Sequence, residues 1–347
     1  MKRRNLGRTD IRVPDMCLGT MTWGTQTSEQ DAHRQIDMAL DRGIDFLDTA
    51  EMYPTTPLSA ETQGRTEAFI GSWIEKTGRR NDLTIATKIV GDGYEAIRGG
   101  APIRADTMRV AVDESLARLK TGVIDLYQLH WPNRGSYHFR KWWRFDPTTQ
   151  DTAETLDHVE EVLHCAELLI EQGKIRALGL SNDSCWGTMR FLALAESEGL
   201  PRVATVQNEY SLLCRHYDLD MAEMSHHEDV GLLAFSPLAA GILTGKYFDG
   251  AVPENSRQSI NDGLGGRLTP RCEPATRAYL AIAEKHGIDP VHFALAFARS
   301  RPFMASVIFG ATTCEQLEHA VGAGDVTLPD EAQAEIAETW RAHPVPM

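Results

Sequence analysis

The sequence lacks the features that mark several large classes of protein. No run approaches the roughly 18 consecutive apolar residues of a membrane-spanning helix. The N-terminal residues are basic but contain no apolar core of about 7–15 residues, so we expect no secretory signal peptide. The 6 cysteines are scattered and form no C-x-x-C pair, which is typical of reduced thiols and not of a disulfide framework or a zinc site. These absences predict a cytoplasmic protein without a metal site.

Positive charge is also in short supply. The 35 Lys and Arg residues are outnumbered by 49 Asp and Glu residues, which gives a net charge of −14 at pH 7. A chain this acidic is a poor candidate for non-specific binding to nucleic acid or to an anionic membrane surface. The remaining composition, 42% hydrophobic and 24% charged, is ordinary for a globular enzyme. Because α/β barrels often use about 250 residues or more in one unit, we predict a single domain over residues 1–347.

Eight short apolar runs alternate with amphipathic helical patterns along the chain. The predicted strands are 16–19, 45–48, 83–88, 124–130, 177–181, 204–208, 231–235 and 306–309. The predicted helices, where apolar residues recur at steps of three and four, are 31–42, 67–76, 106–119, 152–172, 186–198, 276–286, 291–299 and 330–341. Residues 5–10 carry the signal of an N-terminal hairpin. The alternation predicts a (β/α)8 barrel.

A doubly wound sheet is the alternative α/β fold, but its nucleotide signature, G-x-G-x-x-G after the first strand, is absent. Gly91-Asp92-Gly93 follows the third predicted strand and lacks a third glycine, so we interpret it as a plain loop. Two long insertions interrupt the pattern, residues 133–151 and residues 236–274. Segments of this length are usually functional lids or disordered.

Four chemically distinctive residues lie at or just after the ends of three adjacent predicted strands. Asp48 ends the second strand, Tyr53 follows it, Lys88 ends the third strand and His130 ends the fourth. In a barrel, the C-terminal ends of the strands face the active site. Each residue alone has an ordinary interpretation, as a turn-forming acid, a packed ring, a solvated amine or a hydrogen-bonded imidazole. Their occurrence together on one rim favours catalysis.

This group suits proton transfer to a carbonyl oxygen. A free tyrosine has a pKa of about 10, and a neighbouring Lys88 ammonium is expected to lower the pKa of Tyr53. Asp48 would keep Lys88 charged and oriented. A neutral His130 would stabilise the negative charge that develops on the substrate oxygen. Because no nucleophile is needed, the hydride must come from a cofactor.

A series of short motifs runs along nearly the whole chain. They are Asn5–Gly7, Leu18–Met21, Gly43–Tyr53, Ala86–Lys88, Asp125–Trp131, Gly173–Arg176, Gly179–Asn182, Gln207–Tyr210 and Ser236–Leu238. Together they resemble the aldo-keto reductase superfamily. Segments Ala50–Pro54, Glu61–Gly64 and His130–Pro132 are most similar to the bacterial Tas-type reductases, near the potassium-channel β-subunit branch. The resemblance implies a (β/α)8 barrel that reduces aldehydes or ketones to alcohols with NAD(P)H, and it assigns the catalytic tetrad to Asp48, Tyr53, Lys88 and His130.

The resemblance also implies a set of cofactor contacts. Ser181, Asn182 and Gln207 would hold the nicotinamide carboxamide, and Tyr210 would stack on the ring. The pyrophosphate would lie on the loop after the seventh strand, at Ser236, Leu238, Gly241, Gly245 and Lys246. The adenosine end would lie on the loop after the eighth strand, at Gly310, Thr312, Thr313 and Gln316. A P-loop NTPase is rejected, because the spacing from Gly241 to Lys246 is one residue too short and Tyr247 follows.

NADPH is the expected cofactor, with NADH as the alternative. Many relatives carry Arg or Lys near position 313, and Glu and Asn three residues after the glutamine, whereas this chain has Thr313, His319 and Ala320. A missing cation weakens the preference for a 2′-phosphate. Three arginines of the second insertion would compensate if it folds over the cofactor: Arg257, Arg267 and Arg271.

The expected partner is a small-molecule carbonyl substrate, bound in an aromatic cleft lined by Trp23 and Trp131. Trp142 and Trp143 either contribute to this cleft or anchor the first insertion against the barrel, and the sequence leaves both interpretations open. His226-His227-Glu228 is interpreted as a solvated helix end and not as a metal site, because adjacent helical side chains point in different directions.

A rival function is a nicotinamide-nucleotide-sensing binding subunit of a protein partner, because channel-associated members of the superfamily retain the tetrad. A barrel metallohydrolase that uses Asp48 and His130 is rejected, since no second histidine or carboxylate cluster accompanies them. The physiological substrate, the direction of the reaction and the oligomeric state stay open at the level of sequence.

Overall fold

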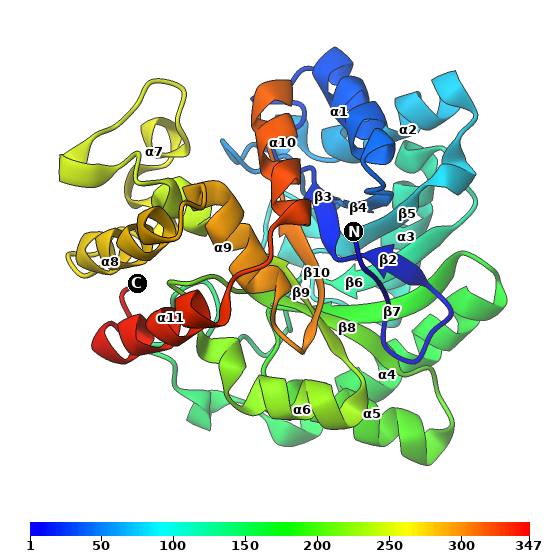
Figure 1. Cartoon of the computed structure of the whole chain (residues 1–347). Coiled ribbons are helices and arrows are strands. Elements are labelled where there is room, and N and C mark those ends of the chain that lie inside the picture. The colour runs from blue at the N-terminus through cyan, green and yellow to red at the C-terminus, as the bar shows by residue number, and fades with distance from the viewer.

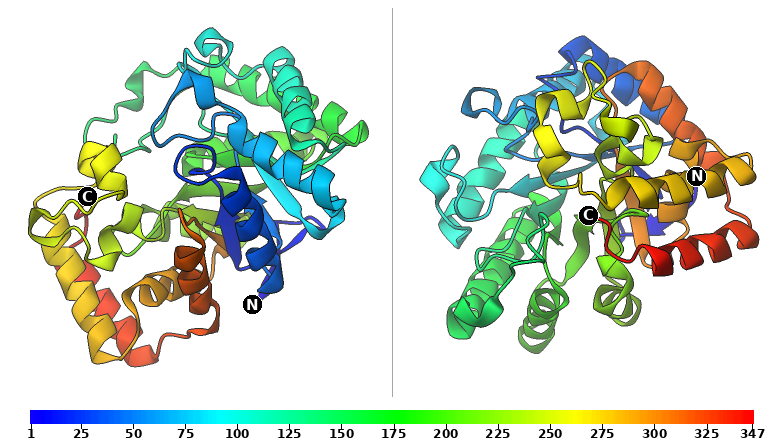
Figure 2. Two further views of the ribbon diagram at one scale, coloured as in Figure 1. Left: turned by 90° about the horizontal axis from the view of Figure 1, so that it is seen from above. Right: turned by 90° about the vertical axis from the view of Figure 1, so that its left-hand side faces the viewer.

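A computed structural model describes all 347 residues of the chain. Eight parallel strands close into a barrel in the order β10-β3-β4-β5-β6-β7-β8-β9, and the helices surround it (Figure 1; Figure 2). The strands are β3 (Met16–Gly19), β4 (Phe46–Asp48), β5 (Thr84–Ile89), β6 (Ile124–Leu129), β7 (Ile175–Ser181), β8 (Val203–Glu209), β9 (Gly231–Phe235) and β10 (Met304–Phe309). The predicted (β/α)8 fold is confirmed, and each strand boundary lies within two residues of its predicted place.

Eight helices occupy the predicted positions. They are α1 (Glu29–Asp41), α2 (Arg65–Thr77), α3 (Ala105–Leu119), α4 (Thr152–Glu171), α5 (Cys185–Glu198), α8 (Cys272–Lys285), α9 (Pro290–Arg299) and α11 (Asp330–Ala342). Of α6 (Asp220–Glu228), only the end at residues 226–228 was predicted. Two further short helices have no predicted counterpart, because they contain too few turns for an apolar period to show: α7 (Arg257–Ile260) and α10 (Cys314–Val321). The C-terminal α11 packs against α8 (Figure 2). None of the helices has the length and apolar character that crossing a bilayer would require.

The N-terminal hairpin closes one end of the barrel. Its strands β1 (Arg3–Asn5) and β2 (Arg12–Pro14) pair in antiparallel fashion, and the side chains of Leu6, Ile11 and Val13 are buried against the lowest layer of the barrel interior. This layer takes apolar residues from every barrel strand: Cys17, Phe46, Ala86, Leu126, Ala177, Ala204, Leu233, Ala305 and Ile308. The hairpin end of the barrel is therefore a packed apolar plug.

Polar side chains form the next layer of the interior. Because side chains alternate between the two faces of a strand, the residues two positions beyond the apolar layer point into the same interior. On three neighbouring strands these residues are Asp48, Lys88 and Gln128, and all three are buried. The strand period thus places ionisable groups together at the C-terminal end of the barrel.

One buried carboxylate joins both long insertions to the barrel rim. Glu209, the last residue of β8, accepts hydrogen bonds from Arg140 Nη1 and from Arg267 Nε, both at 2.6 Å. Arg140 belongs to the first insertion and Arg267 to the second. Burial raises the pKa of Glu209, but the charges of Arg267 and Arg140 outweigh this effect and hold that pKa below its ordinary value. Both insertions are therefore attached to the same strand end.

We expect Glu209→Gln to loosen both insertions at once. The amide keeps the shape of the carboxylate but leaves two guanidinium groups without a counter-charge, and breaking a buried ion pair costs about 3–5 kcal/mol. Chemical denaturation should show a lower free energy of unfolding, and hydrogen exchange should quicken in both insertions. Glu273→Gln, which breaks the exposed Arg277–Glu273 pair, should cost less than about 1 kcal/mol. Faster exchange confined to one insertion would contradict the joint attachment.

Candidate active site

The four predicted rim residues converge on the Lys88 ammonium. Its Nζ donates hydrogen bonds to Asp48 Oδ2 and to the carbonyl oxygen of Thr49, both at 2.7 Å. The Tyr53 ring centroid lies 4.9 Å from the same Nζ and 5.8 Å from the ring centroid of His130. Lys88 has no exposed surface, and the other three side chains are buried as well. The structure thus brings the predicted set into one compact cluster.

Burial decides which members of the cluster carry charge at neutral pH. Burial lowers the pKa of Lys88, but the charge of Asp48 and the nearby Tyr53 outweigh it, so that pKa lies above its ordinary value. Burial, followed by the charge of Lys88, holds the pKa of His130 well below its ordinary value. At neutral pH the amine is therefore charged and the imidazole is neutral.

The pKa of Tyr53 departs from the sequence-based expectation. Burial raises this pKa above its ordinary value, and the opposing charge of Lys88 does not reverse the shift. Lys88 lowers the pKa of Tyr53, as expected, but desolvation of the phenolate is the larger effect, so the net shift is upward and not downward. Tyr53 keeps its proton throughout the neutral range.

Two glutamines hold the Asp48 carboxylate from inside the barrel. Gln207 Nε2 donates to Asp48 Oδ1 at 2.7 Å and to Gln128 Oε1 at 3.1 Å, and Gln128 Nε2 donates to the same Asp48 oxygen at 3.3 Å. Gln207, predicted at the nicotinamide, thus directs its amide nitrogen at the tetrad carboxylate. Gln128 was not among the predicted site residues. Gln128 could have been found from the sequence, because it lies two residues before His130 and therefore on the same face of the strand.

Ser181 and Asn182, at the end of β7, lie beside His130. Asn182 Nδ2 donates to the carbonyl oxygen of His130 at 2.9 Å and to Ser181 Oγ at 3.0 Å. The Oδ1 atom of Asn182 and the Nδ1 atom of His130 are buried without a hydrogen-bond partner in the protein. Buried polar atoms without partners are costly, so these two atoms indicate a polar ligand group. A carboxamide, which offers donors and an acceptor, fits them.

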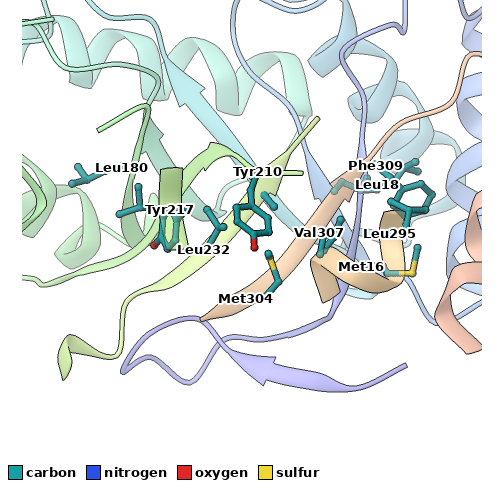
Figure 3. Close-up of a cluster of buried hydrophobic side chains, with 14 of the residues drawn as sticks. Met16, Leu18, Leu180, Tyr210, Tyr217, Leu232, Leu295, Met304, Val307 and Phe309 are labelled. Carbon is teal, nitrogen blue, oxygen red and sulfur yellow. The ribbon is translucent and has the colours of Figure 1, made fainter. Parts of the chain in front are cut away.

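Tyr210 lies outside the site, so the prediction that it stacks on a nicotinamide is wrong. Its side chain is completely buried, its hydroxyl donates to Asp218 at 3.0 Å and its ring packs nearly parallel to Phe297, 6.0 Å between centroids. Figure 3 shows the ring among apolar side chains that include Leu232 and Met304. A ring with no exposed surface has no free face for a heterocycle.

Phe235 is an aromatic rim residue that was not predicted. It ends β9 in register with Glu209 of β8, and it lies two residues beyond Leu233 of the interior layer, so its ring faces the barrel interior. The side chain is only half-buried at this strand end. The signal for it is its place as the last residue of a strand, directly before the predicted loop residue Ser236.

The loop after β9 combines positive backbone φ angles with one cation. Ser236, Gly241 and Gly245 have φ angles of 53°, 93° and 77°. The φ angle of Gly241 lies in the left-handed region, which favours glycine, and the Lys246 side chain folds back over this residue, 2.8 Å from where a Cβ atom would lie. Leu238 packs against the core and anchors the loop to the barrel. The predicted residues therefore form one turn at the rim.

The loop after β10 forms the first turn of α10. Thr313 caps the helix by accepting a hydrogen bond from the N–H of Gln316 at 3.2 Å. Gln316 Oε1 in turn accepts from the N–H and the hydroxyl of Thr312, both at 3.0 Å. Gly310 comes so close to β3 that a Cβ atom would lie 2.9 Å from the carbonyl oxygen of Gly19. These predicted residues share one turn, which contains no cationic side chain.

Of the three arginines that were candidates for the missing cation, Arg257 is the one that is partly buried and pairs with no carboxylate. Arg267 is committed to the buried carboxylate of β8, and the Arg271 guanidinium lies over an exposed tryptophan ring. The Arg257 guanidinium contacts Met21 Sδ at 3.5 Å and Thr56 Oγ1 at 3.2 Å, and it meets no carboxylate. Burial, followed by the charge of Arg267, lowers the pKa of Arg257 to about 10. A partly buried guanidinium without a counter-charge favours an anionic ligand.

The predicted aromatic cleft is partly wrong. Trp23 cannot line it, because this side chain is fully buried and its Nε1 donates to Gln35 Oε1 at 3.0 Å. Trp131 does lie at the rim, with ring centroids 5.1 Å from His130 and 6.1 Å from Phe139. Phe139, which was not predicted, is 41% exposed and extends the aromatic surface away from the cluster.

The two tryptophans of the first insertion and the histidine pair lie in different environments. Trp142 packs against the core with its ring 4.6 Å from that of His216, so it anchors the first insertion. Trp143 is 58% exposed. His226 and His227 are exposed at the end of α6, as the sequence predicts.

Comparison with known proteins gives a consistent result over the whole chain. The sequence model of the Aldo/keto reductase family matches residues 15–341. The chain is 40% identical to Protein tas of Escherichia coli (strain K12), over 100% of this chain and 99% of that protein. It is 30% identical to the uncharacterized oxidoreductase YrpG of Bacillus subtilis (strain 168), over 95% of this chain and 93% of that protein. It is 35% identical to an aldo-keto reductase of Babesia bovis, over 69% of this chain and 88% of that protein. With a barrel and a rim cluster of the expected kind, the chain belongs to the aldo/keto reductase family of oxidoreductases, whose members use nicotinamide cofactors.

Proposed function

We propose that this oxidoreductase reduces the carbonyl group of an aldehyde or ketone to an alcohol with NADPH, and that Tyr53 donates the proton. The observation that carries the proposal is the cluster around Lys88, which sets a buried, protonated phenol beside a buried ammonium. A general acid must hold its proton until the substrate oxygen takes it, and a nearby cation stabilises the anion that remains. The cluster meets both requirements.

Each residue has one task in the proposed reaction. NADPH, when bound, supplies the hydride. Tyr53 transfers its hydroxyl proton to the substrate oxygen, and Lys88 stabilises the phenolate that is left. Asp48, held by its two glutamines, keeps Lys88 in place. The neutral His130 donates a hydrogen bond to the same substrate oxygen, which stabilises the charge that develops there.

The proposed cofactor contacts follow from the unpaired groups of the rim. The nicotinamide carboxamide would meet Asn182 Oδ1 and Ser181, and its ring would lie on Phe235, where stacking is worth about 1 kcal/mol beyond burial. The pyrophosphate would lie over the 236–246 loop. Arg257, which pairs with no carboxylate, would add positive charge to that of the exposed Lys246. Arg267 donates to Ser236 Oγ at 3.3 Å but is already neutralised by Glu209.

The aromatic surface favours a substrate with an apolar or ring-shaped body. Trp131 and Phe139 lead outward from His130 along the first insertion. A small-molecule carbonyl compound that packs on these rings would place its oxygen at the cluster. Trp23 offers the substrate no such apolar surface, because its side chain is fully buried.

We expect Tyr53→Phe to lower kcat about 10²- to 10⁴-fold and to leave NADPH binding nearly unchanged, because the ring stays and only the acid is lost. The matched control is Tyr127→Phe, which removes another buried hydroxyl on β6 that has no hydrogen-bond partner. This control should keep wild-type kcat. The measurements are steady-state rates with a panel of aldehydes and ketones, and single-turnover oxidation of bound NADPH.

The same experiment separates an enzyme from a nucleotide-sensing subunit. Wild-type turnover in Tyr53→Phe, with chemistry shown to be rate-limiting, would remove Tyr53 from the mechanism. Failure of every carbonyl compound to oxidise bound NADPH in the wild-type protein would instead favour the sensing function.

The pH profile of reduction should be flat across the neutral range. His130, with a pKa well below 6.5, stays neutral, and Tyr53, with a pKa above 10, stays protonated. Because Tyr53 acts as an acid, kcat/KM should fall only as pH rises above about 10. The profile should be measured in constant-ionic-strength buffers with a slow substrate. A transition centred near pH 6.5 would show that His130 titrates in the working enzyme.

NADPH should be preferred over NADH, but modestly, because the turn before α10 has no cation of its own. Thr313→Arg should tighten NADPH about 10-fold and NADH much less, since only NADPH carries the 2′-phosphate for a charge-assisted hydrogen bond. Thr313→Ala is the control, because it removes the helix cap without adding charge. Dissociation constants can be measured by quenching of tryptophan fluorescence. Equal tightening of both cofactors would mean that this turn does not face the 2′ position.

A further inference from the structure

Two histidines and an aspartate meet where α9 begins and α10 ends. His319 Nε2 lies 3.0 Å from Asp289 Oδ1, and the ring centroids of His292 and His319 are 5.0 Å apart. One ligand atom of each of the three residues lies within 4.8 Å of the others. The cluster shares no residue with the active site. It is a separate concentration of metal-binding side chains on the surface.

The hydrogen bonding of His292 leaves one of its ring nitrogens available. Nε2 lies 2.7 Å from the carbonyl oxygen of His319. Because a carbonyl oxygen can only accept, Nε2 carries the hydrogen, and Nδ1 of the neutral ring then has a free lone pair. A histidine that binds a metal almost always donates its other ring N–H in this way, which fixes the tautomer and the orientation of the ring.

The ends of both helices hold the cluster in place. Asp289 is the N-cap of α9, and its Oδ1 accepts from the N–H groups of Val291 at 2.9 Å and His292 at 3.1 Å. A Cβ atom at Gly322, directly after α10, would lie 2.8 Å from Cε1 and Nε2 of His292. The missing side chain therefore gives the imidazole its space. The donor atoms belong to the ends of regular elements and not to a long loop.

A second group of one histidine and two carboxylates has its carboxylates already occupied. His286 lies near Glu331 and Glu335, but Lys285 Nζ donates to both carboxylates, at 2.9 Å and 2.5 Å. The ammonium already neutralises the negative charge that would attract an ion. No lysine or arginine hydrogen-bonds to Asp289, which is paired only with His319.

We propose that Asp289, His292 and His319 form a binding site for a divalent transition-metal ion, with Zn²⁺ as the best match. Two imidazoles and a carboxylate are ligands that Zn²⁺ accepts at about 2.0–2.2 Å, and a tetrahedron of that size sets its ligand atoms about 3.3 Å apart. The His319 and Asp289 atoms are already near that separation. A water molecule completes the coordination, because these two side chains are 49% and 36% exposed.

An ion in this site ties the end of α10 to the start of α9. α10 has only eight residues, and it begins at the Thr313 turn that follows β10. A cross-link at its far end stiffens a helix that is too short to be stable by itself. The proposed role is structural.

Calorimetric titration of Zn²⁺ into the full chain, without an added histidine tag, tests the site. We expect one equivalent to bind to the wild-type protein and to raise its Tm. Binding should weaken about tenfold or more in His319→Gln and in Asp289→Asn, and the rise in Tm should disappear. Asp289→Asn keeps a side-chain oxygen that can cap α9, so it separates the loss of a ligand from the loss of the helix.

Two control variants address other zinc-binding groups on the surface. The double variant His226→Gln/His227→Gln removes an exposed histidine pair on α6 whose rings are 4.9 Å apart. Cys314→Ser removes a thiol from the first residue of α10. Both should bind Zn²⁺ like the wild type. Loss of binding in either control, full binding in His319→Gln and Asp289→Asn, or no binding to the wild type would overturn the proposal.

Discussion

The arrangement of the active-site end depends on one buried ammonium group, that of Lys88. An ion taken out of water costs several kcal/mol unless it is paired and hydrogen-bonded. Asp48 and the Thr49 carbonyl supply those partners, and two glutamines then satisfy the remaining oxygen of Asp48. The Tyr53 ring lies against the ammonium, and His130 is kept neutral beside it. The protonation of the cluster thus follows from the pairing of Lys88 with Asp48 and from the burial of Tyr53 and His130.

The need to pair a charge that is taken out of water also explains how the two insertions are held and where a ligand is needed. Glu209 is buried because Arg140 and Arg267 neutralise it, and this pairing brings two segments far apart in the chain to one strand end. Arg257 is the exception, since it is partly buried and meets no carboxylate. An uncompensated guanidinium beside the rim is consistent with a phosphate of the proposed cofactor as its missing partner.

The proposed adenosine end of the rim carries little positive charge. Thr313 and Gln316 cap and brace α10, and the only candidate cation, Arg257, comes from another loop. His319, further along the same helix, contacts Asp289 at the start of α9. The same short helix therefore begins at a turn without a cation and carries one side chain of the cluster that we assign to a metal ion.

The sequence by itself determined the barrel and the place of the tetrad. Strand and helix periods are local, and Asp48, Lys88 and His130 lie at strand ends that a barrel must bring to one rim. Tertiary packing alone decided the rest. Tyr210 and Phe235 differ in which face of the barrel wall they occupy, and Trp23 is buried by neighbours distant in sequence. The direction of the Tyr53 pKa shift, the partner of each arginine and the meeting of His292 with His319 depend on desolvation and on contacts between remote segments, which no local pattern encodes.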